Sequence, residues 1–300
     1  MSAIRNFWAD RRGKTVLLLV GVLLLLAIAA TLLRFENKIP PALVPEGEFT
    51  SRQQPHRAVY DLSLGRMKSG GEVQDISGRM VAEWRGGPSC GGYSSEQRVV
   101  TRVVDTDGNL VSDDTRVATW ESADGQEFHF DRAQYVNGEL SQQEGGAARR
   151  GQDGKHVILE KGEEKPIRLP DETIFPAEFN LRLMTAAEKG ENTISALLFD
   201  GTEDKASIST AFIGKMREPS PATAGIKITN VQFGQPLSGK KAWPIRMSYF
   251  DHLAQDSMPD FQMGYLLFAN GVSAELTLEY EDVTMKATLV GIEYFKPGSC

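Results

Sequence analysis

Apolar and polar residues alternate with a period of two along most of the chain after residue 55. In the run 56–64, for example, Ala58, Tyr60, Leu62 and Leu64 fall on one side. Successive side chains of a strand point to opposite faces, so this pattern predicts sheets with one dry and one wet face. The strands predicted in this way are 56–64, 73–84, 93–104, 110–120, 127–136, 156–160, 193–199, 206–215, 226–233, 243–251, 261–269, 272–280 and 283–295.

Turn dipeptides separate many of these runs. Asn-Gly and Asp-Gly favour type I′ hairpin turns, in which both central residues have positive φ. The chain has such pairs at 107–108, 124–125, 137–138, 153–154, 200–201 and 270–271. Their spacing predicts an all-β fold made of long antiparallel strands that follow one another as a meander.

One segment, 175–190, has helical rather than strand periodicity. Phe175, Phe179, Leu183 and Ala187 form a stripe, with Met184 beside it. A proline suits the first turn of a helix, and a lysine followed by glycine suits its end. The pattern predicts one α-helix over about 176–189 that plugs or covers a curved sheet. A helix that only connects two strands remains the alternative.

The N-terminus carries an export signal. Residues 16–33 are uninterrupted apolar residues, and Arg5, Arg11, Arg12 and Lys14 precede them. A basic segment before an apolar one keeps the N-terminus in the cytoplasm and sends the rest across the membrane. Cleavage after Ala29 would make it a signal peptide. Uncleaved, its roughly 27 Å would make a transmembrane helix that anchors the chain in the inner membrane.

These patterns divide the chain into three parts. Residues 1–34 are the signal peptide or signal anchor, and 35–54, with Pro40, Pro41 and Pro45, form a tether. Residues 55–300 form a single β domain. The leader predicts a periplasmic protein, either soluble or tethered to the inner membrane.

The charge distribution limits the possible partners. The formal net charge is −7, and residues 1–29 contribute +3, which leaves −10 for the exported part. An acidic domain is a poor ligand for nucleic acid or for an anionic lipid surface. We therefore expect no nucleic-acid partner.

Cys90 and Cys300 are the two cysteines of the chain. In an oxidising compartment two cysteines predict a disulfide. Closing a loop of 210 residues contributes about 5 kcal/mol in the chain-entropy model, and measured bonds contribute about 2–4 kcal/mol. Two unrelated thiols are the alternative interpretation.

No catalytic, cofactor-binding or metal site emerges from the motifs. Ser89 lies in a G-x-S-x-G match, but a nucleophile elbow needs a strand, a turn and then a helix, and a strand is predicted to follow here. Ser238 and Lys241 match S-x-x-K without a helix to present them. The histidines, His56, His129, His156 and His252, lack metal-ligand spacing.

Several short blocks together resemble a known family, the EipB-like cell envelope integrity proteins of Gram-negative bacteria. The blocks are Pro55-His-Arg-Ala-Val-Tyr-Asp-Leu62, Ser89-Cys90, Thr119-Trp120-Glu121 with Phe128 and Phe130, 150–154, Leu169-Pro170, Phe175-Pro176, Trp243-Pro244, Ser248-Tyr249-Phe250 and Cys300. The resemblance implies a periplasmic protein with a large, curled, spiral-like antiparallel sheet. It also implies a disulfide between Cys90 and Cys300 and a role in maintaining the envelope under stress, and it transfers no catalytic residue.

Three functions are therefore open. We expect a non-enzymatic envelope-integrity protein that binds another envelope protein. A carrier of lipid or lipoprotein acyl chains is the first alternative, because a curled sheet with a helix can enclose an apolar groove. A hydrolase is the second.

Overall fold

The computed structural model describes residues 53–160, 166–218, 226–234, 236–237, 239–252, 258–280 and 282–300. The signal or anchor predicted over 1–34 and nearly all of the 35–54 tether lie outside these residues. No helix within the described ranges is both long and apolar enough to cross a membrane.

The strands are β1 (His56–Met67), β2 (Val73–Gly87), β3 (Gly92–Asp105), β4 (Leu110–Ser122), β5 (Glu127–Val136), β6 (Glu139–Gly151), β7 (Gly154–Leu159), β8 (Ile167–Leu169), β9 (Thr193–Leu198), β10 (Ser207–Ile213), β11 (Lys227–Thr229), β12 (Ala242–Asp251), β13 (Phe261–Phe268), β14 (Ser273–Glu279) and β15 (Val283–Tyr294).

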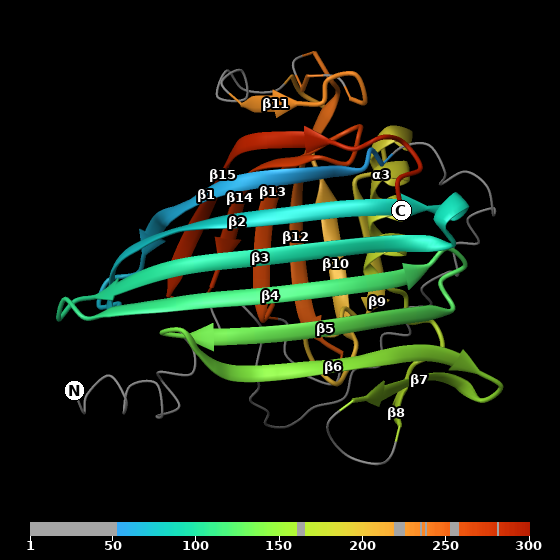
Figure 1. The fold of residues 1–300 in the computed structure, drawn as a ribbon, viewed down its shortest axis with the longest axis horizontal. Coiled ribbons are helices and arrows are strands. Elements are labelled where there is room, and N and C mark those ends of the chain that lie inside the picture. The colour runs from blue at the N-terminus through green and yellow to red at the C-terminus, as the bar shows by residue number, and fades with distance from the viewer. Residues whose placement is uncertain are drawn as a thin grey trace.

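The described strands form a single curled sheet. Its order is β8-β7-β6-β5-β4-β3-β2-β1-β15-β14-β13-β12-β10-β9, and every neighbouring pair along this path is antiparallel. The first strand of the domain pairs with the last, from His56 opposite Tyr294 to Met67 opposite Val283. In Figure 1 the long strands β1 to β6 run across the front, and β12 to β15 cross behind them. The predicted all-β fold with a large curled antiparallel sheet is confirmed.

The two ends of this sheet come together at a short seam. After β8 the chain reaches Ile174, which forms a parallel bridge with Leu198 of β9. The amide of Ile174 donates to the Leu197 carbonyl at 2.8 Å, and the amide of Phe199 donates back to the Ile174 carbonyl at 3.0 Å. The curled sheet therefore almost closes on itself. Strand β11 lies off this path and pairs in parallel with β15.

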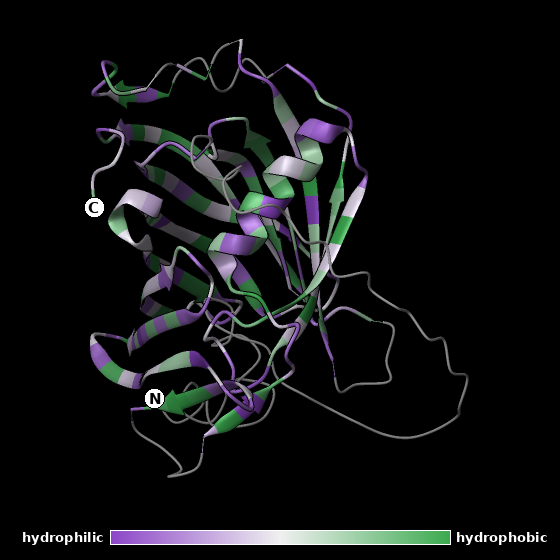
Figure 2. Cartoon of the chain, turned by 90° about the vertical axis from the view of Figure 1, so that its right-hand side faces the viewer, coloured by the Kyte–Doolittle hydropathy of each residue, from purple (hydrophilic) through white to green (hydrophobic). Residues whose placement is uncertain are grey.

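The helix α3 (Pro176–Lys189) has the predicted bounds. Pro176 occupies its first turn, and Gly190 ends it in the left-handed conformation at φ 76°. Figure 2 looks at the right-hand end of Figure 1 and shows the helix lying across that end, with strands on both sides. The helix therefore plugs the curled sheet, as one of the two interpretations predicted.

Several buried clusters meet at this helix. One packs Phe179, Leu183 and Met184 against β9, β10, β12 and β13. A smaller one packs Ala177 and Leu181 against Trp84 and Tyr93 on the opposite wall. A third cluster fills the seam and consists mainly of aromatic and aliphatic side chains: Phe128, Phe130, Ala148, Val157, Leu169, Phe175, Phe199 and Ala206. The helix thus joins walls of the sheet that are far apart in strand order.

Some local predictions were wrong. β6 was not predicted, because its sequence ELSQQEGGAARRG has no apolar alternation, and β8 is only three residues long. The predicted strand 226–233 is reduced to β11, since the chain turns after Thr229. Of the six turn dipeptides, only Asn137-Gly138 has positive φ at both residues, so the type I′ prediction does not hold for the other five.

Candidate functional site

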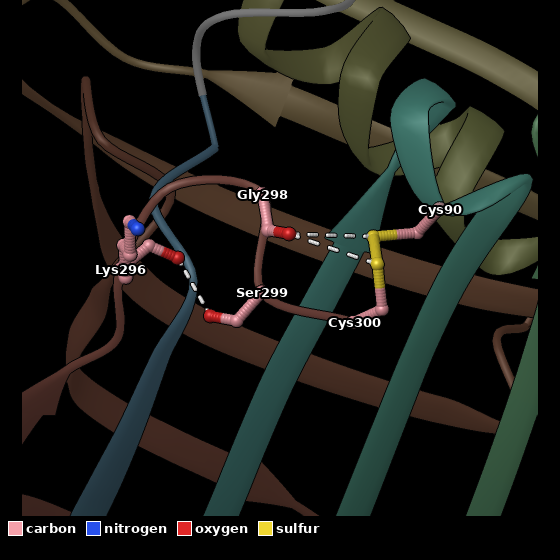
Figure 3. The surroundings of a disulfide bond; sticks show 5 residues. All are labelled: Cys90, Lys296, Gly298, Ser299 and Cys300. Atoms are coloured by element: carbon pink, nitrogen blue, oxygen red, sulfur yellow. Dashed lines mark hydrogen bonds between the residues drawn. A yellow bond between two sulfur atoms is a disulfide. The ribbon is translucent and has the colours of Figure 1, made fainter.

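The C-terminal strap is the segment Phe295–Cys300, which leaves β15 and crosses to the turn between β2 and β3. There Cys300 bonds to Cys90 in the 3-10 helix Pro88–Cys90, with an S–S distance of 2.03 Å and a Cα–Cα distance of 5.5 Å. Figure 3 shows both sulfur atoms facing the Gly298 carbonyl oxygen. The amide of Gly86 donates to the Ser299 carbonyl at 3.1 Å. The bond therefore ties β15 to β2 and β3 across the intervening β1.

Side chains hold the same strap in place. The Arg85 guanidinium lies over the Phe295 ring, 3.7 Å from its centre, and the Arg57 guanidinium lies 5.6 Å from it. Arg57 also binds Glu83 at 2.7 Å and Glu293 at 2.9 Å. A cation stacked on an aromatic face contributes about 0.5–1 kcal/mol at an exposed site. The strap is thus held by non-covalent contacts as well as by the disulfide.

Glu121 of β4 fixes the beginning of α3. Its two carboxylate oxygens accept hydrogen bonds from the backbone amides of Ala177 at 2.6 Å and Glu178 at 3.0 Å. The residue before the helix, Phe175, offers no capping side chain, so a distant strand supplies the acceptor. Burial raises the pKa of Glu121 to about 8, although the two helix amides act in the opposite direction.

Lys155 of β7 is the second buried ionisable residue beside the helix start. Its ammonium donates to the Thr173 carbonyl and lies 4.7 Å from the centre of the Phe175 ring. Burial lowers the pKa of Lys155, and the nearby Arg150 cation lowers it further. Glu121 binds the first turn of α3 from β4, and Lys155 binds the segment before the helix from β7. Together the two side chains hold the start of α3 at the seam.

One pocket beside the helix is small. A pocket of about 50 Å³ lies between Asn180 and Met184 of α3 and Tyr265, Leu267 and Ser273 of the β13–β14 hairpin. This volume suits one or two water molecules, whereas a drug-sized ligand needs roughly 300 Å³ or more. A partner or a lipid could use the apolar stripe of α3 only if the stripe were exposed. Phe179, Leu183 and Met184 are instead buried in the core.

The residues tested for catalysis do not converge. Ser89 is exposed in the 3-10 helix Pro88–Cys90, between two strands rather than before an α-helix. Ser238 lies outside the described residues. The four histidines belong to separate strands or loops. His56 forms a hydrogen bond with the Gln54 carbonyl, and His252 forms one with the Ala206 carbonyl. His129 packs against Trp120, and His156 pairs with Asp153. In the described ranges no three His, Cys, Asp or Glu residues group as metal ligands.

Sequence reasoning missed Glu121 and Lys155. The sequence gives little signal at Glu121, because the residues of the same strand phase include the polar Asp113 and Thr115 as well as Val111, although all four are buried. A carboxylate in phase with buried residues predicts a buried partner. Its partners are backbone amides of a helix, the first of them 56 residues later, which alternation alone does not identify.

Three comparisons with known proteins agree with this architecture. Residues 49–296 match the model of the family described as EipB-like. The chain is 33% identical over 252 residues to the cell envelope integrity protein EipB of Brucella abortus (strain 2308), which covers 82% of this chain and 86% of that protein. The crystal structure of a beta-barrel-like protein of a domain of unknown function from Brucella abortus superposes with a TM-score of 0.74 and 31% identity. It covers 82% of this chain and 99% of its own. The chain therefore belongs to the EipB-like family.

Proposed function

We propose that this chain is exported to the periplasm and maintains the cell envelope without catalysis, by binding another envelope protein. The name of its relative, a cell envelope integrity protein, supports the envelope role. The apolar run 16–33 supports export, either as a cleaved signal or as an anchor. The Cys90–Cys300 bond agrees with an oxidising compartment.

The buried stripe of α3 is the observation that supports binding of a protein over carriage of a lipid. Leu183 and Phe179 occupy the apolar centre of the curled sheet, and the pocket lined by Asn180 and Met184 has about 50 Å³. An acyl chain does not fit in a pocket of that size unless α3 moves. An interface with another protein needs no such movement, because it uses outer surface.

A deletion strain tests the envelope role. Cells without this chain should become sensitive to detergent, and the full chain should restore resistance. Cross-linking of the full chain in these cells, followed by mass spectrometry, should then identify a specific envelope protein. Resistance that does not depend on the chain would contradict the proposal.

Lipid carriage is tested on the full chain extracted from membranes. Native mass spectrometry should find no single acyl-chain ligand bound in stoichiometric amount after exchange into a lipid-free amphipol. A bound lipid that is lost in Asn180→Trp would favour the carrier. Asn180 suits this test because it lines the pocket and is only half-buried, so the substitution fills the pocket without entering the core.

A further inference from the structure

Two neighbouring segments form a surface that we call the basic face. They are 212–217, which covers the end of β10 and the residues after it, and 240–246, which covers the start of β12. Phe212 lies opposite Arg246 in the sheet, the Gly214 amide donates to the Pro244 carbonyl at 2.7 Å, and the Arg217 amide donates to the Ala242 carbonyl at 2.9 Å. The two segments contain five basic residues and no acidic one: Lys215, Arg217, Lys240, Lys241 and Arg246.

The basic face also carries two exposed apolar side chains. Phe212 is 56% exposed and Met216 is 51% exposed. Single exposed apolar residues are common on protein surfaces. Here, however, the two lie on a short stretch of chain that also carries Lys215 and Arg217. Apolar side chains flanked by cations are typical of surfaces that lie at a lipid headgroup layer.

The carboxylates nearby leave an excess of positive charge. Arg217 binds Glu275 at 2.7 Å, and Arg246 binds Glu279 at 2.6 Å. Within the described ranges, no ion pair involves the three lysines Lys215, Lys240 and Lys241. Glu218 follows the first segment, and Glu191 lies beside it, because the Ile213 amide donates to the carbonyl of the next residue, Asn192, at 2.8 Å. The area therefore holds five cations and four carboxylates, a local excess of +1 in a chain with a net charge of −7.

The basic face adjoins the point where the N-terminal tether enters the domain. The Lys241 carbonyl accepts a hydrogen bond from the Ala269 amide at 3.0 Å, and the next residue, Asn270, accepts one from the Gln54 amide at 2.9 Å. The end of the tether and Lys241 are therefore neighbours across the β13–β14 turn. The apolar run 16–33 precedes this point by only 20 residues. A domain held by that run would keep the basic face within reach of the lipid surface.

We propose that the basic face docks the domain on an anionic lipid surface. Phe212 and Met216 enter the headgroup layer, and the three lysines contact anionic headgroups. A lipid surface suits these side chains better than an acidic protein does, because lysines on flexible stems can follow mobile headgroups without a fixed set of acceptors. The acidic remainder of the chain is repelled by the same surface, so only this face turns toward it.

The test uses the full chain, because its N-terminal run keeps it on vesicles whatever the domain does. Met216→Cys gives a thiol for an environment-sensitive dye, while Cys90 and Cys300 stay bonded. Leu140→Cys is the matched control, since Leu140 is 54% exposed and lies at the start of β6 beside Glu139. Vesicles contain phosphatidylethanolamine with phosphatidylglycerol, or phosphatidylcholine alone, and each carries a spin-labelled quencher lipid.

Docking predicts quenching at Met216 but not at Leu140, and only in vesicles with phosphatidylglycerol. Replacing Lys215, Lys240 and Lys241 together by Gln should lower the equilibrium constant for docking by on the order of 100-fold. High salt should also weaken docking. Equal quenching at both sites, or quenching that the lysine changes leave intact, would overturn the proposal. So would a dye at Met216 that is shielded only when an acidic protein is added, because the face would then be a protein interface.

Discussion

The Glu121 carboxylate accepts a hydrogen bond from the Ala177 amide at 2.6 Å, and this contact joins strand β4 to the first turn of α3. An acceptor is needed there because the first amides of a helix have no partner within it. Glu121 is only 4% exposed, so no water can easily replace it. A buried carboxyl group thus helps to fix the position of the plugging helix, and its titration has a consequence that can be measured.

Replacing Glu121 by Gln should change how stability depends on pH. Burial raises the pKa of Glu121 to about 8 from 4.5, so between these values the folded state binds more protons than the unfolded one. The contribution of Glu121 to the free energy of unfolding is then complete below pH 4.5 and is lost as pH rises to 8, by up to about 1.4 kcal/mol per pH unit. Urea unfolding at pH 5, 6.5 and 8 should show this slope. Glu121→Gln should reduce it and leave the smaller contribution of Glu203, whose pKa burial raises to about 7.

The control for this slope is Glu139→Gln, which makes the same change at an exposed carboxyl of β6. That variant should keep the wild-type dependence on pH. If Glu121→Gln and the wild type had parallel stability curves, Glu121 would not be the group that titrates.

Breaking the disulfide should weaken the fold. Cys300→Ser is expected to lower the free energy of unfolding by about 2–4 kcal/mol, because the bond closes a loop with a sequence separation of 210. Alkylation of unreduced, denatured protein should label no thiol in the wild type and one in Cys300→Ser. The double variant with Cys90→Ser should be no less stable than either single one. Two labelled cysteines in the wild type would contradict the pairing.

Shortening the central side chain of the helix should be costly. Leu183 is fully buried, so Leu183→Ala should lower the free energy of unfolding by about 2–5 kcal/mol through lost burial and a residual cavity. Lys189→Ala, in the exposed last turn of the same helix, should change it by no more than about 0.5 kcal/mol. Similar effects at both positions would mean that α3 is not part of the core.

Ser89 should be dispensable for function. It lies in a 3-10 turn between two strands, where no base is placed beside it by any described contact. A fluorophosphonate probe should therefore not label the protein, and Ser89→Ala should restore detergent resistance as fully as the wild type. Stoichiometric labelling that disappears in Ser89→Ala would instead make the chain a hydrolase.

Much of the architecture follows from the sequence alone. Alternation in β1 to β5 and β12 to β15 identifies strands, because a half-buried strand must place every second side chain in the core. The bounds of α3 follow from Pro176 and Gly190, which suit the start and the end of a helix for local steric reasons. With two cysteines, only one intramolecular pairing is possible.

Other features depended on contacts between distant segments, which no local pattern encodes. β6 has no alternation, and its pairing with β5 and β7 makes it a strand. The sequence left open whether α3 plugs the sheet or only connects two strands, and packing against the sheet shows that it plugs it. The segments that carry Lys215 and Lys241 lie side by side because they continue the neighbouring strands β10 and β12, although the whole chain is acidic. Local sterics and periodicity act within a few residues, whereas burial and local charge depend on which segments the fold brings together.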